Sequence, residues 1–264
     1  MKSLLRHFLY LLPILFTTST FARQGVNTKP VHPDTSFIKA KVSLRELDNP
    51  FPLRALIISG AALTYGFVKL NNNALTRLDQ EARHEFYSEH PHRQFIVDDY
   101  LQFAPGAAVF ALNGFSVKGK NSMIDQTGIY LLSNIFLNAT TQSLKRITAV
   151  TRPDGTPNAF PSGHAAEAFA SAEFLRQEYG NQSAWYTVSG YTAATAVAVL
   201  RMYNNRHWLS DVIAGAGLGV LSTRASYWLY PKIKRTLSGK SGKPTLISPV
   251  FNIGTIGFGM VKSF

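Results

Sequence analysis

Apolar residues along the chain gather in six stretches that are separated by short polar breaks. The stretches are rich in small residues and helix formers, and they cover residues 53–70, 103–117, 128–144, 164–179, 185–202 and 209–230. The run Asn71-Asn72-Asn73 follows the first stretch and Pro231 follows the sixth, so we expect helices to end there. The pattern predicts an all-α fold, a bundle of six helices.

Residues 74–88 form a further segment with an amphipathic pattern. Its apolar side chains recur at three- and four-residue steps with charged residues between them, at Leu75, Leu78, Ala82 and Phe86. This spacing predicts a helix with one apolar face. Three histidines lie in or near the segment, His84, His90 and His92. Their spacing matches no standard metal site, so we interpret them as surface residues. In the sixth stretch, Gly215 and Gly219 lie one turn apart and would let another helix approach closely.

The ends of the chain differ from the apolar middle. Residues 1–22 combine the basic Lys2 and Arg6 with an apolar run and a small-residue site at 20–22, which is typical of a signal peptide or an uncleaved N-terminal anchor. Residues 23–50 are polar and contain prolines, so they are interpreted as a linker. Residues 51–235 form the helical domain, and residues 236–264 form a basic, Gly-rich tail with a candidate terminal β-strand.

Charge and cysteine content narrow the function. The formal net charge is +12, which suits anionic partners such as phosphorylated substrates, anionic lipid headgroups or nucleic acid. The sequence shows neither interleaved arginine and aromatic residues nor zinc-type spacing, so no nucleic acid partner is expected. The chain has no cysteine, which excludes a thiol nucleophile, disulfides and thiolate metal sites, and fits a bacterial envelope protein.

Two cations and a proline begin the segment with the most chemistry. Lys145 and Arg152 are seven residues apart, close to two helical turns, so both can face one side. Pro153 disfavours helix at Arg152 and turns the chain. A forked guanidinium and an ammonium fixed on one face suit a phosphate dianion.

The sequence Pro161-Ser162-Gly163-His164 opens the fourth apolar stretch. A helix start offers free backbone N–H groups and partial positive charge to an anion. Gly163 permits close approach of a ligand to the backbone, and Ser162 can cap the helix or donate its hydroxyl. His164 has a side chain that can transfer protons near neutral pH.

A third block contains Arg201, His207 and Asp211. The histidine and the aspartate are four apart, so on a helix they would share a face. A carboxylate that binds one ring nitrogen raises the basicity of the other, which favours a nucleophilic or basic imidazole. Arg201 would add a third cation for an anionic substrate.

Each block alone is common, but ten residues in three ordered blocks form a specific pattern. They resemble the three signature motifs of the type 2 phosphatidic acid phosphatase (PAP2) and vanadium haloperoxidase superfamily. The resemblance implies a PAP2-like six-helix bundle whose active site is formed by loops and helix starts at one end. It implies a metal-independent phosphatase with no cofactor. The family usually has serine before the third-motif arginine, whereas this chain has Leu200, so a hydroxyl contact near Arg201 is expected to be missing.

The resemblance also implies a role for each motif residue. His207 would attack phosphorus and form a phosphohistidine, Asp211 would orient His207, and His164 would protonate the leaving oxygen. The phosphoryl oxygens would be held by Lys145, Arg152, Ser162, Gly163 and Arg201. No metal ligand is expected.

The function predicted from the sequence is hydrolysis of phosphate monoesters or pyrophosphates. The expected substrates are lipid phosphates of the bacterial envelope, of phosphatidate type, polyprenyl pyrophosphate or lipid A. A soluble periplasmic acid phosphatase, acting on small phosphoesters, is one alternative. A haloperoxidase that holds vanadate in the same pocket is another, and a non-catalytic envelope scaffold is a third. The complete set of charged residues argues against the scaffold, and the small size of the chain argues against the haloperoxidase.

The sequence also predicts the location of the protein. We expect export to the bacterial envelope because residues 1–22 have the pattern of a signal peptide. Because the apolar stretches are short or carry charges, we expect a periplasmic domain in contact with a membrane. An integral inner-membrane protein with six spans is the alternative.

Overall fold

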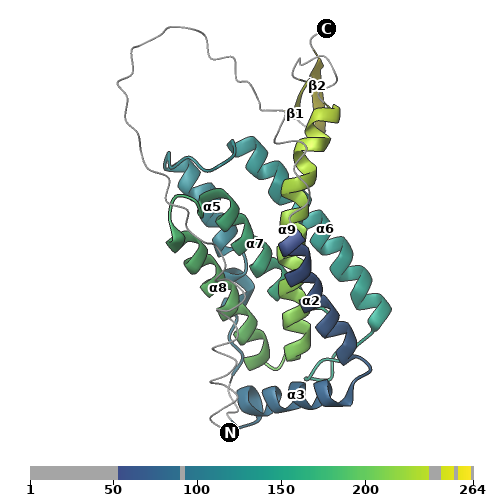
Figure 1. The fold of residues 1–264 in the computed structure, drawn as a ribbon. Coiled ribbons are helices and arrows are strands. Elements are labelled where there is room, and N and C mark those ends of the chain that lie inside the picture. The colour runs from purple at the N-terminus through teal and green to yellow at the C-terminus, as the bar shows by residue number, and fades with distance from the viewer. Residues whose placement is uncertain (1–52, 90–92, 238–244, 253–254, 263–264) are drawn as a thin grey trace. The chain divides into compact units, whose positions relative to one another are not determined.

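The computed structural model describes residues 53–89, 93–237, 245–252 and 255–262 (Figure 1). The predicted signal peptide and the linker lie outside the described residues. The helices are α2 (Leu53–Lys69), α3 (Asn73–Arg83), a π-helical turn (His84–Ser88), α4 (Val97–Leu101), α5 (Ala104–Gly114), α6 (Met123–Thr148), α7 (Gly163–Tyr179), α8 (Ala184–Tyr203) and α9 (Leu209–Leu237). Strands β1 (Thr245–Asn252) and β2 (Thr255–Lys262) pair antiparallel, from Thr245 opposite Lys262 to Asn252 opposite Thr255.

The predicted all-α class is confirmed for the domain, although the described residues contain eight α-helices rather than six. The additional ones are the amphipathic α3, which the sequence also predicted, and the short α4. Pro231 was expected to end the last helix, and this expectation is wrong, because α9 continues to Leu237. Pro231 is exposed near the end of the helix, where water can satisfy the carbonyl that loses its hydrogen bond.

Helix α7 is the centre of the bundle and packs against α5, α8 and α9 (Figure 1). Two glycines of α9 permit the closest of these contacts, as the sequence predicted. A Cβ atom on Gly215 would lie 2.5 Å from the carbonyl oxygen of Ser162, and one on Gly219 would collide with the carbonyl of Ala166. Helix α9 therefore lies directly against the first turns of α7, which brings the second and third sequence motifs together.

Buried carboxylates of α7 hold the surrounding helices through hydrogen bonds. Glu173 accepts from Arg176 and from Arg224 of α9, and Glu178 accepts from Gln126 of α6 at 3.0 Å. Buried charges are stable only when they are paired in this way. These bonds explain how a helix with several acidic residues occupies the core.

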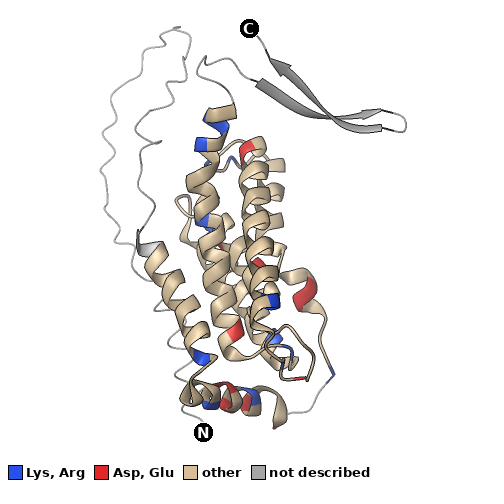
Figure 2. Ribbon diagram, turned by 90° about the vertical axis from the view of Figure 1, so that its right-hand side faces the viewer, with Lys and Arg blue, Asp and Glu red and all other residues tan. Residues whose placement is uncertain are grey.

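In the part of the chain that the structure describes, every helix is too short or too polar to cross a membrane. Figure 2 shows that the long helices of the bundle carry few charged residues along most of their length, whereas α3 carries charges of both signs.

Candidate active site

A cavity of about 400 Å³ lies where α6 ends and α7 begins. Six of the residues singled out in the sequence line it, namely Lys145, Arg152, Gly163, His164, Arg201 and His207. They come from the last turns of α6 and α8, the first turn of α7, and the loops that follow α6 and α8. The three motifs therefore meet at one end of the bundle.

The two cations of the first motif reach the cavity from different elements. Lys145 lies in the last turn of α6 and donates from Nζ to the carbonyl oxygen of Asn158, at 2.7 Å. Helix α6 ends at Thr148, before a left-handed Ala149, so Arg152 is not helical. The expectation that helical spacing aligns Lys145 with Arg152 is therefore wrong. Arg152 instead reaches the cavity through a turn of the loop after α6. In this turn its backbone N–H donates to the carbonyl oxygen of Thr156, at 2.8 Å.

The loop between α6 and α7 is fixed to the rest of the bundle at three points. Phe160 is fully buried, with its ring 5.2 Å from that of Phe67 in α2, and the Phe160–Pro161 peptide is cis. Trp208 donates from Nε1 to the carbonyl oxygen of Thr151. Asp154 accepts from Arg206 at 3.1 Å. The position of Arg152 is thus set by contacts on both sides of it.

Ser162 caps α7 and links it to the third motif. Its hydroxyl accepts from the N–H of Ala165, and its own N–H donates to the carbonyl oxygen of Asp211, at 3.0 Å. Ser162 is fully buried, and Gly163 rather than Ser162 lines the cavity. The capping role proposed for this serine is the one the geometry shows. The first N–H groups of α7 lie beside the cavity, where they would attract an anion.

His207 lies in the loop before α9, and Asp211 lies in the first turn of that helix. His207 Nδ1 and Asp211 Oδ2 are 3.5 Å apart, and both residues are buried. The same carboxylate accepts from the backbone N–H of Trp208, at 2.9 Å. The pair is adjacent as expected, although the two residues do not share a helical face, because His207 precedes the helix.

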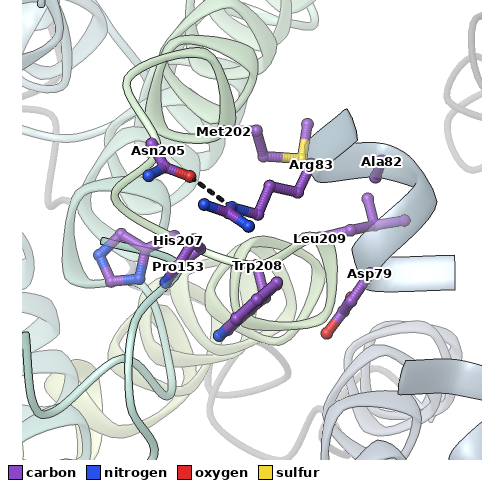
Figure 3. A pocket seen from close by; sticks show the side chains of 9 residues that line it. All are labelled: Asp79, Ala82, Arg83, Pro153, Met202, Asn205, His207, Trp208 and Leu209. Atoms are coloured by element: carbon purple, nitrogen blue, oxygen red, sulfur yellow. Dashed lines mark hydrogen bonds between the residues drawn. The ribbon is translucent and has the colours of Figure 1, made fainter. Parts of the chain in front are cut away.

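Helix α3 lies beside the loop that carries His207, and Figure 3 shows Arg83 of this helix reaching Asn205 of that loop. Buried Asp79 accepts from the backbone and hydroxyl of Ser210 at 2.9 and 2.7 Å, and it pairs with Lys69 at 2.9 Å. Arg83 donates to Asn205 at 2.9 Å (Figure 3). The polar side of this amphipathic helix therefore positions the segment that carries His207.

Two acidic residues of α4 belong to the site and were missed by the sequence reasoning. Asp98 accepts from Arg201 at 2.6 Å, and both side chains are buried. Asp99 lies 2.8 Å from His164 Nε2 and 3.8 Å from Arg201. They form the only adjacent pair of acids in the sequence, which was the available signal.

Burial and neighbouring charges shift the pKa values of the site. Burial, then Lys145 and the arginines, hold the pKa of His207 well below its usual value, so its imidazole is neutral at neutral pH. Burial raises the pKa of Asp211 to about 6. Burial, then Arg152, lowers the pKa of Lys145 to about 8. Burial and Arg201 lower the pKa of His164, and Asp99 opposes this change.

Several buried polar atoms of the site have no hydrogen-bond partner among the described residues, including Nε of Arg152, Nε of Arg201 and Nδ1 of His207. Buried donors of this kind cost free energy unless a partner is supplied. A tetrahedral oxyanion in the cavity could accept from the two guanidinium Nε atoms. The donor set therefore fits phosphate.

Metal-binding residues do not cluster in the described part of the chain, where no group of three or more histidine and acidic side chains could hold an ion. His84 pairs with Glu89 at 3.3 Å, while His90 and His92 lie outside the described residues.

The part of the chain that carries the three motifs also matches a known protein family. Residues 126–235 match the family model described as the PAP2 superfamily. This match confirms the resemblance drawn from the three motifs, all of which lie within it.

Two curated relatives are similar over parts of their length. A lipid A 1-phosphatase from Porphyromonas gingivalis is 38% identical over 172 residues, which are 60% of this chain and 38% of that protein. The bacitracin transport permease protein BcrC from Bacillus licheniformis is 37% identical over 76 residues, 29% of this chain and 36% of that protein. The chain thus matches less than half the length of these relatives.

Two solved structures also resemble the chain. A transmembrane PAP2-type phosphatidylglycerolphosphate phosphatase from Bacillus subtilis is 21% identical, with 69% of this chain and 98% of that chain covered and a TM-score of 0.47. LpxE from Aquifex aeolicus is 18% identical, with 68% and 96% covered and a TM-score of 0.39.

Proposed function

We propose that this chain, whose residues 126–235 match the PAP2 superfamily model, is a metal-independent phosphatase for phosphate monoesters or pyrophosphates of envelope lipids. The observation that carries the proposal is the meeting of three cations and two histidines in one cavity, with buried guanidinium donors that lack partners among the described residues. Phosphoryl transfer depends mainly on positioning and on stabilising negative charge, and this site supplies both.

In the first proposed step, Nε2 of His207 attacks phosphorus and the bond to the ester oxygen breaks. The neutral imidazole has a free electron pair for this attack, and Asp211 stabilises the positive charge that develops on the ring. His164 donates a proton to the departing oxygen. Its pKa is low without substrate, but a phosphate dianion beside it would raise that pKa and favour the protonated form.

In the second step, water attacks the phosphohistidine and releases phosphate. His164, now neutral, takes the proton of that water, and His207 regains its electron pair. Lys145, Arg152 and Arg201 stay beside the phosphoryl oxygens through both steps and stabilise the charge that accumulates there. The cycle returns each group to its starting protonation state.

A lipid substrate and membrane contact are supported by apolar residues beside the site. The segment around α4 exposes large apolar side chains, at Phe95, Ile96, Val97, Tyr100 and Phe103. The same segment carries Asp98 and Asp99, which pair with Arg201 and His164. An exposed apolar patch of this kind is typical of a binding surface. The lipid A 1-phosphatase activity named for the P. gingivalis relative also favours a lipid phosphate.

Phosphate release from a chromogenic ester and from a panel of lipid phosphates tests the proposed activity. His207→Ala should lower kcat by about a thousand-fold or more, since removing a nucleophile has effects of this size. His84→Ala, at a largely exposed histidine outside the cavity, should retain wild-type kcat. Equal hydrolysis by wild type and His207→Ala would refute the catalytic assignment.

We place the catalytic domain in the periplasm, in contact with the membrane. Protease added to intact spheroplasts should degrade this domain, whereas a cytoplasmic control protein should survive. Protection of the domain until the membrane is lysed would contradict this location.

A further inference from the structure

The cavity extends well beyond the residues that would hold a phosphate. Along α6 its lining runs from Lys145 back to Asn134, eleven residues or about 16 Å at 1.5 Å per residue. The volume of about 400 Å³ falls within the range of sites for whole small molecules. The phosphate cradle occupies only the end at which α7 begins, so the remainder is available to another part of the substrate.

Polar side chains without charge dominate this remainder. On α6, Asn134, Asn138 and Gln142 follow one another at four-residue steps and Thr141 lies three residues after Asn138, so they lie along one side of the helix. Gln102 and Glu167 face them from other elements. Phe103 and Leu137 add apolar surface. The lining therefore combines hydrogen-bonding groups with two apolar side chains.

Thr141 and Glu167 are buried polar residues of this lining, and one of them lacks a hydrogen-bond partner among the described residues. Thr141 is 3% exposed, and its hydroxyl has no hydrogen-bond partner among the described residues. Glu167 is 6% exposed, and its Oε1 accepts from Tyr130 at 2.8 Å and from Ser171 at 3.4 Å, so this carboxylate is held in place at the cavity wall. A buried hydroxyl such as that of Thr141, which lines a cavity and has no partner among the described residues, needs one from whatever fills the cavity. Glu167 also lies one turn after His164, on the side where the leaving oxygen would receive its proton.

We propose that this part of the cavity binds the leaving group of the substrate and that this group is polyhydroxylated, as in a glycosyl or polyol phosphate. The proposal rests on the proposed phosphatase function and specifies its substrate class. The amide, carboxylate and hydroxyl groups of the cavity can form hydrogen bonds with the hydroxyl groups of such a ligand, because a hydroxyl both donates and accepts. An alkyl or prenyl group in the same place would leave the Thr141 hydroxyl unpaired and would offer nothing to the remaining hydrogen-bonding capacity of the amide side chains. Sites built to bind a substrate hydroxyl reject such analogues strongly.

Paired substrates test this inference. The ratio of kcat/KM for glucose 1-phosphate to kcat/KM for n-hexyl phosphate should be well above one in the wild type. Thr141→Val, which keeps side-chain shape, and Glu167→Gln should each lower this ratio about ten-fold. Thr140→Val is the matched control, because Thr140 is exposed and does not line the cavity, so it should keep the wild-type ratio. An unchanged ratio in both cavity variants would overturn the inference.

A binding measurement separates this inference from the proposed function. Calorimetry with the His207→Ala variant should show tighter binding of glucose 1-phosphate than of n-hexyl phosphate, and Thr141→Val added to it should reduce the difference. If the wild type released no phosphate from either ester but this preference held, the phosphatase proposal would fail and the hydroxyl-binding subsite would stand. Equal affinity for the two esters would refute the subsite even if both were hydrolysed.

Discussion

Replacing Asp98 by asparagine removes one charge from a buried pair at the edge of the active site. Asp98 is 1% exposed and Arg201 is 7% exposed, and their atoms Oδ2 and Nη1 are 2.6 Å apart. The substitution keeps the size of the side chain, so it tests charge rather than packing. It leaves Arg201 buried and only weakly paired, with Asp99 at 3.8 Å as the next carboxylate.

The expected cost follows from this geometry. Breaking a buried ion pair by removing one partner typically costs about 3–5 kcal/mol. The asparagine oxygen can still accept a hydrogen bond and Asp99 offsets part of the lost charge, so we expect the free energy of unfolding to fall by about 2–3 kcal/mol. For a domain of this size the melting temperature should fall by roughly 5–10 °C.

Thermal and urea unfolding measure this cost, and Asp99→Asn is the matched control. Asp99 is about half exposed, so its loss should lower stability by about 1 kcal/mol or less. Inorganic phosphate should raise the melting temperature of Asp98→Asn more than that of the wild type, because the site then carries one more net positive charge to attract the anion. Equal stability losses in the two variants would refute the view that the buried pair at Asp98 holds Arg201 in place.

Three further predictions follow from the site and the core. The pH profile of kcat/KM should fall below about 6, where Asp211 gains a proton, and should show a step near 8, where Lys145 loses one, in addition to the decline that follows from loss of the His164 proton. Lys145→Arg should remove the step near 8, and a step that persists would show another group to be responsible. Gly215→Ala should lower the free energy of unfolding by about 2 kcal/mol or more, because the new Cβ would lie 2.5 Å from the carbonyl oxygen of Ser162. The control Gly60→Ala in α2 has open space around the new Cβ and should be neutral or stabilising by about 0.5–1 kcal/mol. Denaturation curves that coincide for the two variants would contradict the packing argument. A chelator should leave phosphate release unchanged, and restoration of lost activity by added Mg²⁺ would contradict the metal-independent mechanism.

The helices could be predicted from the sequence because apolar runs of helical length indicate which segments are buried in the bundle. The close contact of α7 and α9 was also foreseen, since Gly215 and Gly219 lie one turn apart. The helix end predicted at Pro231 was wrong because the effect of a proline depends on its position in the helix. Near an exposed helix end the loss of one backbone hydrogen bond costs little free energy. Helix ends set by local preferences alone are the least predictable feature.

The motif residues could be found from the sequence because ten residues occur together in three ordered blocks with defined spacings. Their catalytic roles stay predictions until variants are measured. Arg152 reaches the cavity through a turn and not through the helical spacing that suggested it. Asp98 and Asp99 could not be assigned to the site, because the Arg201–Asp98 contact joins residues 103 positions apart and depends on the packing of α4 against α8.

The pairing of Arg201 with Asp98 also explains how the site remains charged while it is buried. Three cations around one cavity would repel each other and lose solvation, and the lowered pKa of Lys145 reflects this cost. Asp98 pairs with Nη1 of Arg201, whereas Nε of the same arginine has no partner among the described residues. Arg201 is therefore held by its Nη1 and Arg152 by its backbone N–H, while Nε of each arginine remains available to an anion. A phosphate that enters adds hydrogen bonds to donors already in position, so its binding requires little rearrangement of the side chains that would stabilise the transition state.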